Sequence, residues 1–464
     1  MVFSSLIFLW IFLPIVLLVY FIAGKRLRNV VLLIASLVFY AWGEPKYILL
    51  MLISIFVNWI IGLFMDQCEK YKNPLLIVAV IWNLGLLGYF KYFNFLIDIV
   101  NHCIGSEIAY QEIRLPIGIS FFTFQILSYV IDLYRGQYKA QKNLINLALY
   151  ISFFPQLIAG PIVKYKDIDA QLAYREITTD KLADGIRRFI YGLGKKVLIA
   201  NVAAKCVDTI FALDYVNVTG WLAWAAAILY MLQIYYDFSG YSDMAIGLGK
   251  IFGFEFQENF CYPYLSRSIQ EFWQRWHISL GTWFKEYLYI PLGGNRKGKV
   301  RTYINLLIVF GATGLWHGAS MNFVLWGLYH GFFSILERMG LRERLTKHPV
   351  FSHLYAMLVV VFGWVLFRAE NLRQAGRYVK RMLLPWMYTN TNVKWQILFG
   401  NRTILMIIVG ILGTGMMQQF LKKKCSIEKW KYSIPELLMC AGIFLLCIAN
   451  LASNTYNPFI YFRF

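Results

Sequence analysis

The 464-residue chain is 59% hydrophobic and only 15% charged, whereas a soluble globular domain carries about 25% charged residues, which excludes an ordinary soluble protein. In a soluble protein, its net charge of +20 would suggest that it binds nucleic acid. In a membrane protein, basic loops that face the cytoplasm and anionic lipid headgroups explain this charge. We therefore expect membrane lipid, and no nucleic acid, as partner. Seven cysteines, an odd number without CxxC spacing, exclude a complete disulfide framework.

Long uncharged runs predict membrane-spanning helices, because a helix needs about 20 residues to cross the bilayer core. One such run lies between Lys46 and Asp66 and another between Lys347 and Arg368. In chain order the predicted spans begin near residues 3, 29, 47, 74 and 115 and then cover 217–236, 302–316, 321–336, 353–367, 403–421 and 434–452. Alternating strands are absent, so we predict an all-α, multi-pass integral membrane protein.

Basic residues at the ends of the first runs predict the orientation. Positive charge follows the first run at Lys25, Arg26 and Arg28, which anchors an uncleaved helix with its N-terminus outside. The next basic loops, around Lys70 and around residues 135–142, then face the cytoplasm, and the bias alternates along the chain as the positive-inside rule requires.

The segment 147–163 breaks this pattern. It is apolar but contains Pro155, Gly160 and Pro161, and the following stretch 164–196 holds eight Lys or Arg. Two prolines disfavour a straight helix, and a full crossing would put the basic stretch outside. We therefore predict a re-entrant element followed by a basic cytoplasmic region. Irregular backbone at membrane depth requires protein or a wet cavity around it, which is a first indication of an internal tunnel.

No internal repeat or low-complexity linker divides the chain, so a single membrane domain over residues 1–464 is the economical interpretation. The most polar late loop, 369–400, is expected to lie on a surface.

His317 is the first candidate for chemistry. It lies near the middle of the charge-free run from Thr302 to Leu336, among glycines. An ionisable group at membrane depth is costly and is by default a functional hypothesis, and imidazole suits base catalysis near neutral pH. The alternative, of equal weight from the sequence, is a histidine that only hydrogen-bonds between helices, with glycines that permit close helix packing.

His277 is the second candidate. It follows Arg275 and Trp276 in the region 265–290, which mixes basic, acidic and aromatic residues. Such a composition predicts an amphipathic helix in the membrane interface. That interpretation explains less well why an arginine and a histidine lie together between tryptophans.

A third cluster closes the uncharged run after Asp214 and includes Asp237, Ser239 and Tyr241. It is either an ordinary helix end with capping residues or the polar lining of a substrate cavity, and spacing alone leaves both open. Nucleotide-binding, serine-hydrolase and HExxH motifs are missing. We expect no metal site and no permanently bound cofactor.

Several motifs together resemble one enzyme family. They are the run Phe272-Trp273-Gln274-Arg275-Trp276-His277-Ile278-Ser279-Leu280 with its extension to Tyr289-Ile290-Pro291-Leu292-Gly293-Gly294-Asn295-Arg296, the block Trp316-His317-Gly318, and the blocks beginning at Met1, Pro116, Phe154 and Tyr236. This pattern is similar to membrane-bound O-acyltransferases. It resembles most closely their alginate O-acetyltransferase membrane-subunit branch, over nearly the whole chain.

The resemblance implies about 11–13 transmembrane or re-entrant helices around a central funnel or tunnel, in the cell (cytoplasmic) membrane. The family's essential histidine falls on His317 and its second on His277. The implied reaction moves an acetyl group from a cytoplasmic thioester, acetyl-CoA, to a hydroxyl of an extracytoplasmic polysaccharide. A separate partner with a serine-hydrolase-like (SGNH) domain is implied, since this chain shows none.

In the expected mechanism His317 is the general base that takes the proton of the acceptor hydroxyl. His277, Arg275 and the indole N–H groups of Trp276 and Trp316 orient the acceptor or stabilise the oxyanion. No serine or cysteine stands out as a covalent nucleophile. The basic stretch 164–196 is expected to attract the phosphates of the donor.

Three alternatives stay open at the level of sequence. A sister branch transfers D-alanine to teichoic acid from a carrier-protein thioester and shares the Arg-Trp-His pattern. A secondary transporter would also explain buried histidines and broken helices, although it predicts inverted repeats. A structural subunit that only recruits the true transferase is the third.

Overall fold

The computed structural model describes residues 1–391, 393–415, 417, 431–453 and 456–460, and these are helices and loops without a β-strand. The predicted all-α class is therefore confirmed. The chain forms two compact units, one of residues 1–189 with 244–257 and the other of residues 190–243 with 258–464. Each unit is described by itself.

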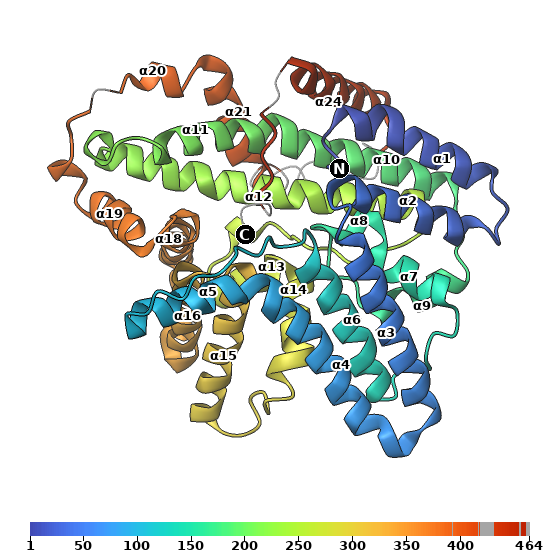
Figure 1. Ribbon diagram of the computed structural model, residues 1–464. Coiled ribbons are helices and arrows are strands. Elements are labelled where there is room, and N and C mark those ends of the chain that lie inside the picture. The colour runs from blue at the N-terminus through green and yellow to red at the C-terminus, as the bar shows by residue number, and fades with distance from the viewer. Residues whose placement is uncertain (392, 416, 418–430, 454–455, 461–464) are drawn as a thin grey trace. The chain divides into compact units, whose positions relative to one another are not determined.

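The first unit contains most of the N-terminal helices (Figure 1). Its helices are α1 (Leu13–Ile22), α2 (Arg28–Gly43), α3 (Ile48–Gln67), α4 (Lys72–Leu87), α5 (Phe93–Ile104), α6 (Ile119–Tyr134), α7 (Leu144–Ser152), α8 (Phe154–Leu157), α9 (Tyr165–Ala173) and most of α10 (Thr179–Gly194). Buried aromatic rings hold its start together. The rings of Phe3, Phe8 and Phe39 and that of Phe154 on α8 have centroids 5.0–6.3 Å apart, a separation typical of favourable ring pairs.

The apolar segment 147–163 breaks where its prolines predict. Helix α7 ends at Ser152, Phe153 leaves the helical region with ψ 112°, and only the four-residue α8 follows before α9. The amide of Asn29 donates to Asn146 Oδ1 (2.8 Å) and to the carbonyl of Leu172 (2.9 Å). The start of α7 and the end of α9 therefore meet at Asn29. That is the geometry a re-entrant element needs, and the re-entrant topology itself stays a proposal.

The second unit contains the C-terminal half of the chain (Figure 1). Its helices are α11 (Asn201–Phe211), most of α12 (Gly220–Ile251), α13 (Ile269–Arg275), α14 (Ile278–Phe284), α15 (Lys299–His317), α16 (Met321–Leu336), α17 (Arg342–Thr346), α18 (Pro349–Arg368), α19 (Leu372–Leu383), α20 (Trp395–Leu398), α21 (Asn401–Gly413) and α24 (Ile434–Ser453). The buried face of α12 supplies much of the apolar core, together with α13 and α18.

Helices α15 and α16 lie side by side in Figure 1, and glycines explain their close approach. A Cβ on Gly314 would lie 2.2 Å from the carbonyl oxygen of Phe323, and one on Gly327 would lie 2.1 Å from that of Phe310. Small residues that let two backbones approach are the usual device of membrane helix pairs. His317 is the last residue of α15, so this contact fixes its position.

Four described helical stretches are long and apolar enough to cross a membrane, at Ile48–Gln67, Glu69–Ile104, Pro349–Arg368 and Ile434–Ser453. Shorter apolar helices cover Phe8–Ile22, Arg28–Gly43, Ile119–Tyr134 and Asn401–Gly413. The chain is a membrane protein.

Predicted spans 217–236, 302–316 and 321–336 fall on α12, α15 and α16, which carry buried polar residues and hold the candidate site. The end of the predicted span 403–421 lies outside the described residues.

Two sequence predictions need correction. Residues 265–290 do not form one amphipathic helix, because α13 ends at Arg275 and α14 begins at Ile278. The polar stretch 369–400 is not only a loop, since it contains the strongly amphipathic helix α19. Helix α5 was not predicted from the sequence. Neither were α10 and α11, which lie within and after the basic stretch 164–196.

Candidate active site

His277 lies at a sharp break between two short helices. Helix α13 starts at a capping box, in which Ser268 Oγ accepts from the Glu271 N–H (3.0 Å) and Glu271 accepts from the Arg267 N–H (2.8 Å). After Arg275 the chain turns, and His277 adopts a left-handed conformation with φ 46° and ψ 53°. Histidine is among the few non-glycine residues enriched there. The turn buries the imidazole instead of leaving it on a helix face.

Asn259 fixes the protonation pattern of His277. Its side-chain oxygen accepts from the N–H of Ser279 (3.3 Å) and the hydroxyl of Ser279 (2.9 Å), and its amide donates to Ser242 Oγ (3.0 Å). That same oxygen lies 3.2 Å from His277 Nδ1. An acceptor oxygen requires a donor, so neutral His277 carries its proton on Nδ1 and Nε2 is the basic nitrogen. Burial lowers the pKa of His277 well below its usual value, and the charge of His317 acts in the same direction.

His317 is enclosed by aromatic rings. The centroids of Trp316, Trp326 and Phe367 lie 5.0–5.2 Å from its imidazole, and only 7% of the residue is exposed. A small cavity of about 10 Å³ reaches the ring, and its other walls are Ile234, Phe238, Trp276, Trp364, Phe367 and Ile460. A volume of this size holds about one water molecule or one hydroxyl oxygen. His317 is therefore buried, with space beside its ring for about one small atom group.

An aromatic partition separates the two histidines. Phe238 packs edge-on against His277 at 4.5 Å and also lines the cavity of His317. Trp316 lies between them as well, with centroids 6.0 Å from His277 and 5.0 Å from His317. The structure thus brings together the two histidines that the sequence singled out, one on each side of the same two rings.

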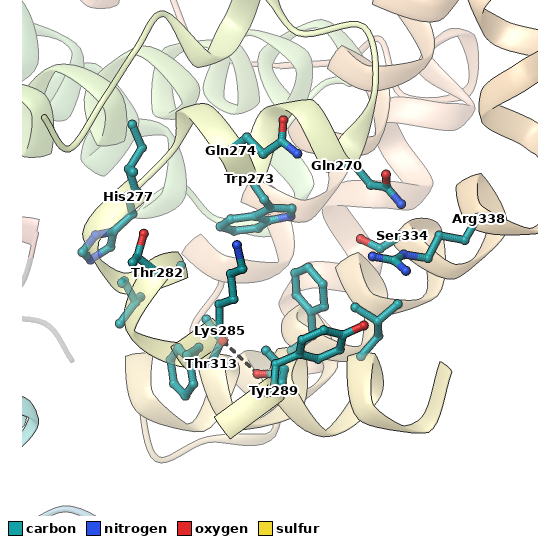
Figure 2. A pocket seen from close by; sticks show the side chains of 17 residues that line it. Gln270, Trp273, Gln274, His277, Thr282, Lys285, Tyr289, Thr313, Ser334 and Arg338 are labelled. Carbon is teal, nitrogen blue, oxygen red and sulfur yellow. Dashed lines mark hydrogen bonds between the residues drawn. The ribbon is translucent and has the colours of Figure 1, made fainter. Parts of the chain in front are cut away.

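His277 belongs to the lining of a much larger pocket of about 400 Å³, and Figure 2 shows its imidazole at the edge of that pocket. Ligand pockets for small molecules typically measure 300–1,000 Å³. Figure 2 shows Lys285 and Arg338 among its walls, together with Gln270, Gln274 and Thr282. The lining residues that the structure describes include no carboxylate. The pocket therefore favours an anionic or carbonyl-bearing ligand over a cation.

Two buried donors of this pocket have no hydrogen-bond partner among the described residues: the indole N–H of Trp273 and the hydroxyl of Tyr289. An unpartnered buried donor costs about 1–3 kcal/mol, which a bound acceptor would recover. Both residues are labelled in Figure 2, and both belong to the pocket lining. Neither was among the candidates from the sequence, although both lie within its family-like motifs.

The predicted substrate-binding residues divide into two groups around the histidines. Trp276 lines the cavity of His317, and Trp316 forms part of the partition. Arg275 lines neither described cavity. It pairs with Glu271 (2.8 Å) and donates to the carbonyl of Cys261 (3.3 Å), so its contacts hold the α13 turn in place. A substrate-binding role for these three residues stays a prediction.

Asp237, Ser239 and Tyr241 are buried within α12 and line neither of these cavities. Asp237 pairs with Lys196 at 2.5 Å, and both side chains are about 3% exposed. Asp237 also accepts from the N–H of Ile460 (2.8 Å), and the ring of Tyr241 stacks on Phe459 at 4.9 Å. The cluster therefore anchors the segment 456–460, whose Ile460 forms a wall of the His317 cavity. Substrate binding by the cluster stays a prediction.

Asn259 and Phe238, like Trp273 and Tyr289, are residues of the site that were not predicted from the sequence. Asn259 lies 18 residues before His277 in sequence, where no motif connects them. Phe238 lies in sequence within the cluster of Asp237, Ser239 and Tyr241, and nothing in the sequence distinguishes it from an ordinary core residue. Among the described residues no group of three or more His, Cys, Asp or Glu could hold a metal ion.

The chain is similar to several known proteins. The sequence profile of the membrane-bound O-acyltransferase family matches residues 139–373. The chain is 41% identical over 489 aligned positions to the probable alginate O-acetylase AlgI of Pseudomonas putida, covering 100% of both chains. It is 36% identical to the peptidoglycan O-acetyltransferase of Helicobacter pylori, over 82% of this chain and 80% of the relative.

A more distant relative is the teichoic acid D-alanyltransferase of Bacillus subtilis, 27% identical over 55% of this chain and 69% of the relative. All three names describe acyl transfer, and the alginate and peptidoglycan enzymes match over most of the chain. These matches favour an enzyme over the secondary transporter and the structural subunit. The chain belongs to the membrane-bound O-acyltransferase family and is an O-acyltransferase.

Proposed function

We propose that this enzyme transfers an acetyl group from a cytoplasmic thioester, acetyl-CoA, to a hydroxyl of an extracytoplasmic polysaccharide or of a partner protein. The observation that supports the proposal is the pair of buried histidines that share Trp316 as a ring neighbour, one of which belongs to the lining of a pocket of about 400 Å³. The names of the alginate and peptidoglycan relatives support acetyl over D-alanyl as the group transferred.

The large pocket is proposed to hold the thioester end of the donor. Lys285 and Arg338 supply positive charge for its phosphates, and the loop that follows the pocket carries Arg296, Lys297 and Lys299. The unpartnered N–H of Trp273 and hydroxyl of Tyr289 offer hydrogen bonds to carbonyl oxygens of the donor.

His317 is proposed as the general base. The acceptor hydroxyl would place its oxygen beside His317, which takes the proton as the oxygen attacks the thioester carbonyl. For this step the side chains of Phe238 and Trp316 would have to move, because the small cavity and the large pocket are separate in this structure. The carbon–sulfur bond then breaks, and the proton passes to the leaving thiolate. A positioned base contributes about 10²- to 10⁴-fold in rate. His277, held by Asn259 with Nε2 as its basic nitrogen, is proposed to orient the reacting groups.

Delivery beyond the membrane is proposed to need a partner with a serine-hydrolase-like domain, as the resemblance implies. The protein is proposed to lie in the cytoplasmic membrane as a multi-pass protein, with segment 147–163 re-entrant and 164–196 on the cytoplasmic face.

The test compares His317→Ala, His317→Gln and His348→Ala in the purified protein in lipid nanodiscs. His348 is exposed and lines neither described cavity, so it controls for the loss of a histidine. Release of CoA thiol from acetyl-CoA is measured with alginate or peptidoglycan as acceptor, together with the thermal unfolding midpoint.

We expect both His317 variants to lose roughly 10²- to 10⁴-fold in rate with unfolding midpoints close to wild type, while His348→Ala keeps full activity. Full activity of His317→Gln would contradict the role as base. A loss of activity that follows only from unfolding would assign His317 to packing.

A further inference from the structure

A second pocket, in the first unit, is lined by cations and amides. Its volume is about 260 Å³, and its polar walls are Lys25, Arg26, Arg28, Asn29, Asn143, Asn146 and Arg175. Its remaining walls are backbone and apolar or aromatic side chains, and none of them is a carboxylate. Four positive charges without a counter-charge in the wall make the pocket a site for an anion.

The cluster is built into the fold. Asn29 accepts from Arg175 Nη1 (2.7 Å) and donates to Asn146 Oδ1 and the Leu172 carbonyl, which joins the starts of α2 and α7 to the end of α9. Arg28 and Arg175 both lie over the ring of Tyr20, with Cζ atoms 5.3 and 5.9 Å from its centroid. Two guanidinium groups are therefore held beside one ring.

Parts of both guanidinium groups lack partners. Arg28 Nε and Arg175 Nη2 are buried, and neither atom has a hydrogen-bond partner among the described residues. None of the four cations forms an ion pair within the described chain. Holding like charges together and leaving buried donors unpaired both cost free energy, and a bound anion would offset both costs. The first turn of α2, which begins at Arg28, adds the positive end of its helix dipole.

The surroundings of the pocket indicate which anion. Helix α1 ends beside it, and Leu18, Ile22 and Leu27 expose 62%, 76% and 58% of their surface. Leu18 and Ile22 belong to the uncharged run that the sequence predicts to lie in the membrane, with its basic end on the cytoplasmic side, and Leu27 follows that run between Arg26 and Arg28. A cationic pocket next to an exposed apolar helix end suits a ligand with an anionic head and a hydrocarbon tail.

We propose that this pocket binds the phosphate group of an anionic phospholipid headgroup at the cytoplasmic face of the membrane. Basic pockets between helices on this side are a recurrent way of holding such headgroups. The lipid would tie together the start of α2, the start of α7 and the end of α9. The proposal involves neither histidine and does not depend on the acetyl-transfer reaction.

The test compares the full-length wild-type protein with a variant in which the two most accessible cations of the pocket are neutralised. Lys25 and Arg26 are exposed and make no described side-chain contact, so Lys25→Gln/Arg26→Gln is expected to fold normally. The matched control is Lys70→Gln/Lys139→Gln, which removes the same charge from two other exposed positions of the first unit outside the pocket. Native mass spectrometry measures binding of phosphatidylglycerol and of phosphatidylcholine to each protein.

We expect wild type and the control to bind phosphatidylglycerol in preference to phosphatidylcholine. We expect the pocket variant to lose roughly 10- to 30-fold in phosphatidylglycerol affinity, the effect of removing two basic residues near an anionic headgroup. An Arg28→Gln variant is expected to weaken binding in the same direction.

Equal binding of both lipids by wild type, or equal loss in the control variant, would overturn the proposal. Separate arms add inorganic phosphate or CoA to the lipid-bound protein. Displacement of phosphatidylglycerol from the wild type by either soluble ligand at micromolar concentration would assign the pocket to a free phosphate compound and overturn the lipid proposal.

Discussion

At the scale of single residues, the site depends on how His277 is held. Its left-handed backbone turns the imidazole into the protein, and Asn259 selects which nitrogen carries the proton. A buried asparagine with all of these bonds fixes the ring orientation as well as its tautomer. We regard Asn259 as a positioning residue for the proposed reaction.

Replacing Asn259 with Ala should release the His277 ring and allow either tautomer. We expect kcat to fall by roughly 10-fold or more, a part of what a positioned acid–base group contributes, with little change in KM for acetyl-CoA. Ser242→Ala is the control, since it removes only the bond to the Asn259 amide. Steady-state CoA release checks both variants, and an unchanged kcat in Asn259→Ala would argue against the positioning role.

Asp237 offers a second test at this scale. Asp237→Asn leaves the Lys196 charge buried without its partner, and breaking such a pair costs about 3–5 kcal/mol. We expect a clear fall in unfolding temperature for this variant and recovery in the double variant Asp237→Leu/Lys196→Met, because removing both charges is often neutral. A stable Asp237→Asn protein with a raised KM would instead support the substrate-binding role predicted from the sequence.

At the scale of elements, the α15–α16 pair positions His317. A methyl group on Gly314 would lie 2.2 Å from the carbonyl oxygen of Phe323, whereas one on Gly311 of the same helix meets only Leu328 Cδ2 at 3.7 Å. We expect Gly314→Ala to lower stability by about 1–3 kcal/mol, the usual cost of overpacking, and to lower activity with it. Gly311→Ala should behave like wild type when thermal unfolding and CoA release are measured, and equal behaviour of the two variants would contradict this packing.

The length and composition of each helix explain whether the sequence could predict it. The uncharged runs predicted the bounds of α3, α18 and α24 to within a few residues, because the thickness of the bilayer sets the length and the apolar composition of such helices. The break at 265–290 escaped prediction because its cause is the left-handed His277 and the distant Asn259, which no periodicity records. Helix α5 was missed because polar residues interrupt its apolar pattern.

At the scale of the whole molecule, both candidate histidines could be named from the sequence, one from its depth in an uncharged run and both from family motifs. The different surroundings of the two histidines could not be predicted from the sequence. The sizes of the two cavities and the partition of Phe238 and Trp316 between them arise from helices far apart in the chain. The role of Asp237 in holding the segment 456–460 likewise depends on a contact across more than 200 residues.

The central claim is that an acetyl group enters from the cytoplasmic side and leaves on a hydroxyl at the other face. The most direct measurement uses proteoliposomes with oriented enzyme, radiolabelled acetyl-CoA on one side only and an acceptor polysaccharide with the purified partner protein on the other. The account predicts labelled ester on the acceptor only when acetyl-CoA is on the side of the basic loops, and none with His317→Ala. Equal labelling from either side, or labelling that persists in His317→Ala, would contradict it.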